Sequence, residues 1–208
     1  MADDEYSAAD ITVLDFTDHV RRCPGMYFRV GPRSPEFATS VLCRVLSSAL
    51  HPDTRLAPDH TLRVDVGISG DLAFAVTDDH AGQMDRQGRP RLGFHDSLLG
   101  ADRWMTAAAA ALARRAVVEV WRDGRGFRQA LTALRPDSAP VRFEPPAGSG
   151  TRVAVELDPE YFGREAAIGD DLGSLDLHGP YCVEPGGPGH IVIRDARSGR
   201  SPTEWRYG

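Results

Sequence analysis

The chain has 208 residues, 41% of them hydrophobic, so it can bury a core, and we expect one globular domain over residues 1–208 with residues 1–17 as an N-terminal arm. The formal net charge of −6 argues against the basic surface that direct nucleic-acid binding requires. All 24 positive charges are Arg, because the chain contains no Lys and also no Asn, which excludes Schiff-base lysines, P-loop lysines and Asn metal ligands.

The cysteines and the N-terminus argue against a secreted or membrane protein. Cys23, Cys43 and Cys182 are odd in number and widely spaced, so neither a disulfide framework nor a structural zinc site is expected, and we expect no metal. The acidic N-terminus has no apolar run, and no stretch of 18 apolar residues occurs. We therefore expect a cytoplasmic protein without a membrane segment. The richness in Ala, Gly and Arg suggests a bacterium of high GC content.

Two helices are expected first. Apolar residues at Ile11, Leu14 and Phe16 lead into a short helix that stops at Pro24. A long helix then follows Ser34 as its N-cap. The apolar stripe of this long helix comprises Val41, Leu42, Val45, Leu46, Ala49 and Leu50.

A β-hairpin is expected between residues 62 and 78, because apolar residues alternate on both sides of a Ser-Gly-Asp turn. The alternation puts Asp78 in line with Phe74 and Val76. Its carboxylate should therefore emerge from the buried face at the end of the strand, either as a turn residue or as a binding group.

A polar loop over residues 82–96, with three Gly, is a candidate lid. An Ala-rich helix should follow, capped by Asp102 and ending at Arg114 and Arg115. A second hairpin is expected with its turn at Asp123-Gly124.

The C-terminal part should contribute strands at "VRFEP" and "GSGTRVAVELD", a loop-rich stretch over residues 163–189 with some helix, and a final hairpin. Thr151, Val153 and Val155 should share one face of the second of these strands. The order of elements predicts an α+β fold with helices on one face of a mainly antiparallel sheet.

The stretch "ITVLDFTDHVRRCPGMYF" resembles the start of the ATPase domain in the B subunits of DNA gyrase and topoisomerase IV. The long helix, the hairpin ending in Asp78, the Ala-rich helix, "WRDGRGFRQ", "SGTRVAVELDP" and "IVIRDARSGRSPTEWRYG" follow in the family's order. The resemblance covers nearly the whole chain and implies the GHKL, or Bergerat-type, ATPase fold, with helices packed on a mixed sheet.

The resemblance implies a ligand pocket. In the family, an Asp at the position of Asp78 accepts the adenine amino group, and a Thr at the position of Thr151 supports it. Arg122 matches an Arg at the pocket mouth, and Ser48 lies in the same pocket. The implied pocket wall comprises Val45, Ala49, Val76 and Val153.

The catalytic half of the family's site is altered. Arg44 stands where the family has the Glu that activates water, and Ser48 stands where it has the Asn that binds magnesium. Arg stays protonated and cannot be a general base, and a Ser hydroxyl is a poor ligand for a hard cation. We therefore expect no ATP hydrolysis and no cofactor, although ATP or ADP could bind without a normal magnesium site.

The phosphate-binding elements also differ from the family. His80 replaces the first Gly of the Asp-x-Gly-x-Gly turn, and Arg103 and Trp104 replace small residues of the Gly-rich lid. The chain ends at "WRYG", where the family begins a second domain with a catalytic Lys, so the resemblance implies no topoisomerase activity.

Two functions remain open. The first is a catalytically inactive GHKL domain that binds a nucleotide or another small flat ligand and acts by binding or regulation, with a homodimer through the N-terminal arm as one arrangement. The second is an enzyme of small-molecule or secondary metabolism in the former ATP pocket, with His80, Asp79 and Arg44 as candidate catalytic groups. His80 follows two carboxylates, which should raise its pKa. Arg44 could anchor an anion or pair with Asp79, and residual ATP hydrolysis would need a base from elsewhere.

Overall fold

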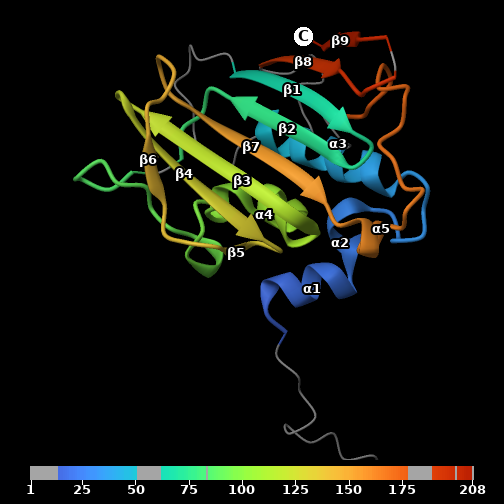
Figure 1. The fold of residues 1–208 in the computed structure, drawn as a ribbon, viewed down its shortest axis with the longest axis horizontal. Helices are drawn as coiled ribbons and strands as arrows, with labels where there is room; N and C mark the ends of the chain where they lie inside the picture. Colours follow the sequence, from blue (N-terminus) through green and yellow to red (C-terminus); the bar gives the residue numbers. More distant parts are fainter. Residues whose placement is uncertain (1–13, 51–61, 83, 178–188, 200, 208) are drawn as a thin grey trace, which may run out of the picture.

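The computed structural model describes residues 14–50, 62–82, 84–177, 189–199 and 201–207. These residues form a mixed α+β structure in which the main helices lie on one face of a nine-stranded, mostly antiparallel sheet (Figure 1). The expected α+β class is confirmed, and the arrangement is compatible with a GHKL-type fold.

The helical segments occur in the first, middle and later parts of the chain. The α-helices are α1 (Phe16–Arg22), α2 (Pro24–Phe28), α3 (Phe37–Leu50), α4 (Trp104–Ala111) and α5 (Pro159–Phe162). Two single turns of 3₁₀-helix, η2 (Phe94–Asp96) and η3 (Ala101–Arg103), precede α4.

The sheet has the strand order β5-β4-β3-β7-β2-β1-β8-β9, and β6 pairs with β4 beside this path. Strands β1 and β8 are parallel, and the other pairs are antiparallel. The strands are β1 (Leu62–Gly70), β2 (Ala73–Asp78), β3 (Ala113–Arg122), β4 (Arg125–Thr132), β5 (Arg135–Pro136), β6 (Val141–Phe143), β7 (Gly150–Leu157), β8 (Gly189–Asp195) and β9 (Thr203–Tyr207).

The three expected hairpins are confirmed as β1–β2, β3–β4 and β8–β9. The turn of the second lies at Asp123 and Gly124, both with positive φ, as a two-residue hairpin loop requires. Asp78 lies on the buried face of β2 with Phe74 and Val76, as the alternation predicted.

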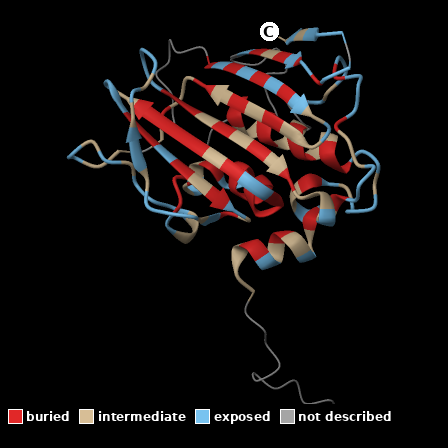
Figure 2. Cartoon of the chain, viewed as in Figure 1, coloured by how far each residue is buried: buried red, intermediate tan, exposed pale blue. Residues whose placement is uncertain are grey.

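The core lies between this face of the sheet and the helices. Helix α3 packs on β1 and β2, while α4 packs on β3, β4 and β7. The predicted apolar stripe of α3 is buried throughout. Burial alternates along β1, β2 and β7, because their other face is not covered by these helices (Figure 2). Helix α4 is buried over nearly its whole surface, which its small Ala side chains permit.

Three predicted element boundaries are wrong. The Ala-rich helix is shorter than expected: its N-cap is Arg103 rather than Asp102, and Arg114 and Arg115 belong to β3, because the chain turns into the sheet after Leu112. The long helix starts at Phe37, after a turn. The short helix α1 ends at Arg22, before Pro24, as expected, and Pro24 begins a second helix, α2, where its missing N–H costs nothing.

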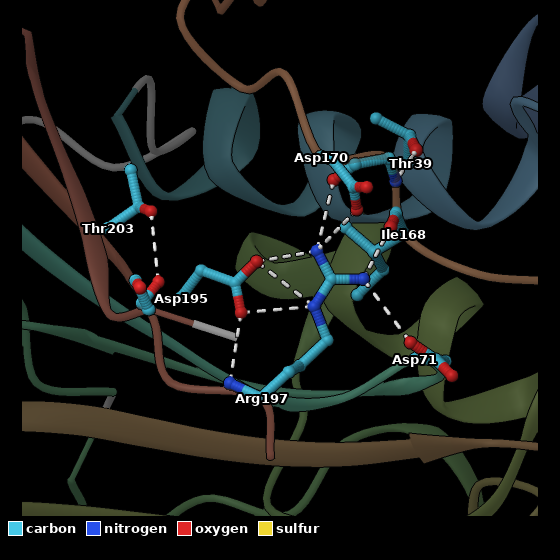
Figure 3. A network of polar contacts seen from close by, with 9 residues as sticks. Thr39, Asp71, Ile168, Asp170, Asp195, Arg197 and Thr203 are labelled. Atoms are coloured by element: carbon cyan, nitrogen blue, oxygen red, sulfur yellow. Dashed lines mark hydrogen bonds and ion pairs between the residues drawn. The ribbon is translucent and has the colours of Figure 1, made fainter. Parts of the chain in front are cut away.

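A buried arginine joins the end of β8 to the loop after α5 (Figure 3). The guanidinium of Arg197 binds both carboxylate oxygens of Asp195, with Nη2 at 2.5 Å from Oδ2. It also donates to the carbonyl of Ile168 at 2.7 Å and to the carboxylate of Asp170 at 3.1 Å. These contacts hold the described part of the expected loop-rich stretch, residues 163–177, against the sheet. This part contains no helix, and residues 178–188 lie outside the described residues.

Candidate functional site

The site is organised by the strand register. Asp78 is the last residue of β2 and lies opposite Thr151 of β7, and Thr151 in turn lies opposite Val120 of β3. All three residues are buried and share the helix-facing side of the sheet. Asp78 and Thr151, which the sequence assigned to one pocket, are therefore direct neighbours.

The carboxylate of Asp78 is bound by Arg103. Nη1 of Arg103 lies 2.7 Å from Oδ2, and Nη2 lies 2.8 Å from Oδ1, so the ion pair is bidentate. Both side chains are buried, with 2% of the Asp78 and 8% of the Arg103 side chain exposed. Burial by itself lowers the pKa of Arg103, but the Asp78 charge and hydrogen bonds outweigh it and raise the pKa.

The turn after β2 is held by the same residues. The carbonyl oxygen of His80 accepts a hydrogen bond from Arg103 Nη2 at 2.6 Å and another from Thr151 Oγ1 at 2.9 Å. The His80 backbone N–H donates to Asp78 Oδ1 at 3.0 Å. Asp78, His80, Arg103 and Thr151 thus form one connected polar centre, which we call the Asp78 centre.

The expected effect on His80 is wrong in direction. Its pKa is lowered, because burial and the charge of Arg103 outweigh the opposing effect of Asp78. The sequence showed the neighbouring carboxylates but not the cation that the fold brings against them. At neutral pH the imidazole is therefore uncharged and able to accept a proton.

Arg44 and Ser48 are half-buried on α3, outside its apolar stripe. Burial and the charge of Arg29 lower the pKa of Arg44, and Asp176 is among its other charged neighbours. The Nε atom of Arg44 is buried and has no hydrogen-bond partner among the described residues. Pairing with Asp79, one of the two roles left open for Arg44, is not among its contacts in the described part; Asp79 accepts from the backbone N–H of Arg63.

A cavity of about 330 Å³ adjoins the Asp78 centre. Val120 of β3 lines it together with residues of the segment 82–103, among them Arg103. We call this segment, of which residue 83 lies outside the described residues, the lid segment. The implied wall residues Val45, Ala49, Val76 and Val153 belong to the packed core and do not line this cavity. This cavity is therefore not the pocket that the resemblance implies, and that pocket stays a prediction.

Arg122 lies beside the lid segment, where its Nη2 donates to the Ala81 carbonyl at 3.5 Å. It lines a second hollow of about 440 Å³ together with Arg86 and Arg125. Its charge also contributes to the lowered pKa of His80. The structure therefore places Arg122 at the edge of the Asp78 centre rather than inside the first cavity.

The lid segment is anchored at its far end. The side chain of Gln129 in β4 accepts from the Leu98 backbone N–H at 2.9 Å and donates to the Asp96 carbonyl at 3.4 Å. The ring of Phe94 stacks on Phe16 of α1, with centroids 4.4 Å apart.

Residues 1–13 lie outside the described residues, so the predicted dimer through the N-terminal arm stays a prediction.

Comparison with known proteins gives one distant relative. The B subunit of topoisomerase IV from Caulobacter vibrioides is 29% identical over 179 aligned residues, covering 76% of this chain and 25% of the relative. This chain is similar to the topoisomerase IV B protein. No family model matches the chain. The chain spans about a quarter of the length of that relative, and the similarity supports a gyrase B-like, GHKL-type relationship.

In the described part of the chain, no group of three or more His, Cys, Asp or Glu side chains is arranged to hold a metal ion. Over the same residues, no helix has both the length and the apolar character needed to cross a membrane.

The sequence did not indicate the partner of Asp78. In the sequence, Arg103 stands out only as a large residue where the family has small ones, 25 positions from Asp78. The available signal was an acid on an apolar strand face, since a buried carboxylate requires a cation or hydrogen-bond donors. Which of the 24 arginines supplies the cation is decided by the fold.

Proposed function

We propose that the chain is a gyrase B-like GHKL domain that does not hydrolyse ATP and acts by binding a small ligand. The observation that carries the proposal is the Asp78–Arg103 ion pair, because Arg103 takes the carboxylate oxygens that adenine uses in the family. The arginine at the position of the general base supports it, since Arg44 cannot accept a proton from water.

The ligand proposed here is small. The cavity beside the Asp78 centre has a volume of about 330 Å³, at the lower end of the size of ligand sites in proteins. A triphosphate tail would have to pass His80 and Arg103, which replace small residues of the family's phosphate loops. A compact molecule between Val120 and the lid segment fits these dimensions better than a complete nucleotide.

The alternative function is acid–base chemistry on such a molecule. It is favoured by His80, whose half-buried imidazole has a lowered pKa and is neutral at pH 7 beside the Asp78 centre. His80→Gln would distinguish the two functions. The variant could still bind a ligand, but it would lack the proton acceptor that general-base catalysis by His80 requires.

The first test is phosphate release from ATP with magnesium. We expect no turnover above the blank, and turnover that is lost in Asp78→Ala would overturn the proposal. The second test is a screen of small compounds for thermal stabilisation, in which a compound at 100 times its Kd adds about 2.7 kcal/mol. Thermal stabilisation by ATP that requires magnesium would also contradict the proposed function.

A variant that fills the cavity provides the matched control for the screen. Gly82 lines the cavity, and a Cβ atom there would meet only Val120 Cγ1, at 3.8 Å. Gly82→Val should therefore fold but lose the stabilisation by any compound that binds in the cavity. Gly67→Val, in β1 away from the cavity and with no atom near its added Cβ, should keep it.

A further inference from the structure

Within the Asp78 centre, three acceptor oxygens surround one planar cation, the guanidinium group of Arg103. Asp78 Oδ1, Asp78 Oδ2 and the His80 carbonyl oxygen accept three hydrogen bonds from the two terminal nitrogens of Arg103, at 2.6 to 2.8 Å. This geometry matches a flat group with several N–H donors at one end. It is a recognition site for such a group, which the chain fills with its own side chain.

The acceptors and the donor come from different parts of the fold. Asp78 is fixed by the register of β2 with β1 and β7, and the His80 carbonyl is also held by Thr151. Arg103 instead comes from the lid segment, in the turn η3 just before α4. Removal of the Arg103 side chain therefore leaves the acceptor oxygens in place.

Arg103 is also an imperfect occupant. Its Nε atom is buried and has no hydrogen-bond partner among the described residues. A buried donor without a partner costs free energy, and the desolvation of a buried ion pair adds to that cost. A free amidinium, which has the same two terminal donors but no third nitrogen, would satisfy the acceptors at least as well, and a free guanidinium would present the same donors as Arg103 itself.

The charge of Asp78 selects the class of ligand. In this chain Arg103 supplies the counter-charge of the buried Asp78 carboxylate. Exchange of Arg103 for a neutral donor such as adenine, which the family's Asp accepts, would remove that counter-charge, whereas a planar cation would keep it. An amidinium or guanidinium group supplies the planar donors and the positive charge together. The adjoining cavity, which Arg103 lines, offers about 330 Å³ for the rest of such a molecule.

We propose that Arg103 determines specificity by occupying a recognition site for small planar cations of the guanidinium or amidinium class. This inference deepens the proposed function by naming the ligand class of the same site. Arg103 excludes neutral bases from Asp78, and a planar cation that displaces it takes over its hydrogen bonds.

The test measures the Tm of Arg103→Ala with methylguanidinium as the probe. The probe is added at millimolar concentrations, well below those at which guanidinium salts denature proteins. Methylammonium serves as the matched cation without a planar donor array, and adenosine as the neutral planar donor. We expect methylguanidinium to raise the Tm of Arg103→Ala by about 2–4 °C or more, and methylammonium and adenosine to leave it unchanged. The wild type should respond less, because its site is filled.

The double variant Arg103→Ala/Asp78→Asn locates the effect. We expect it to lose the response to methylguanidinium, because the counter-charge is gone. Equal responses to methylguanidinium and methylammonium, a response that persists in the double variant, or stronger stabilisation by adenosine would each overturn the inference. If Arg103→Ala does not fold alone, refolding in methylguanidinium but not in methylammonium supports it, and failure in both overturns it.

These outcomes are independent of the test for hydrolysis. Phosphate release by the wild type would overturn the proposed function while leaving the Arg103→Ala result to be judged by itself. An unresponsive Arg103→Ala variant would overturn only the ligand class, because the absence of ATP turnover does not depend on it.

Discussion

Asp78 and Thr151 face each other across β2 and β7, and both bind the same residue: Asp78 Oδ1 accepts from the His80 N–H, and Thr151 Oγ1 donates to the His80 carbonyl. The turn that follows β2 is therefore fastened at both its amide and its carbonyl. The strand register, which places the two residues side by side, is what shapes the Asp78 centre.

Thr151→Val should destabilise the protein by about 1 kcal/mol, because it removes the hydrogen bond from Oγ1 to the His80 carbonyl but leaves the one from Arg103. Urea unfolding measures the change. Thr77→Val is the matched control, since Thr77 lies on the opposite face of the adjoining strand, and its effect should stay within about 0.5 kcal/mol. Equal losses in the two variants would contradict the role of Thr151.

The pH dependence of stability should carry a contribution from His80. Burial and the charge of Arg103 lower its pKa below 6.5 in the folded protein. The unfolded chain therefore binds more protons in this range, so His80 reduces the free energy of unfolding as the pH falls below about 6.5. His80→Gln should lose less stability than the wild type between about pH 7.5 and pH 5.

The control for this measurement is His190→Gln, at an exposed position of β8. Its pH profile should follow that of the wild type. Parallel profiles for the wild type and His80→Gln would show that the imidazole of His80 protonates as easily in the folded protein as in the unfolded chain.

Arg197→Met should destabilise the protein by about 3–5 kcal/mol, because it leaves the buried Asp195 carboxylate without its counter-charge. Only 3% of the Arg197 side chain is exposed. Chemical denaturation measures the loss. Arg194→Met is the control: Arg194 also bridges two acids, Asp65 and Glu204, but it is exposed, so we expect a much smaller loss than for Arg197→Met. Similar losses would contradict the structural role of the buried pair.

Gly124→Ala should cost about 1–2 kcal/mol, because Gly124 has a φ of +71° in the β3–β4 turn and a Cβ atom is strained there. No atom lies near the added Cβ, so the cost comes from the backbone alone. Gly67→Ala in β1 also has free space, without the positive φ, and should be neutral or slightly stabilising. Thermal unfolding of the pair separates the two effects.

Much of the fold could be predicted from the sequence. The period-2 alternation in β1, β2 and β7 and the Asp-Gly turn at residues 123–124 are local signals, and the three hairpins that they predicted are confirmed. The boundaries around the Ala-rich segment were wrong, because the high helix propensity of Ala favours a longer helix and the turn after Leu112 has no sequence marker.

The sequence by itself determined that Asp78 ends a strand on the buried face, and its resemblance to gyrase B-type ATPases predicted that Arg44 stands at the position of their general base. These are properties of periodicity and position along the chain. Only the tertiary structure decided that Arg103 binds Asp78 and that burial, together with the charge of Arg103, lowers the pKa of His80. Such contacts join residues from separate elements, and a chain with 24 arginines offers many cations that only packing can distinguish.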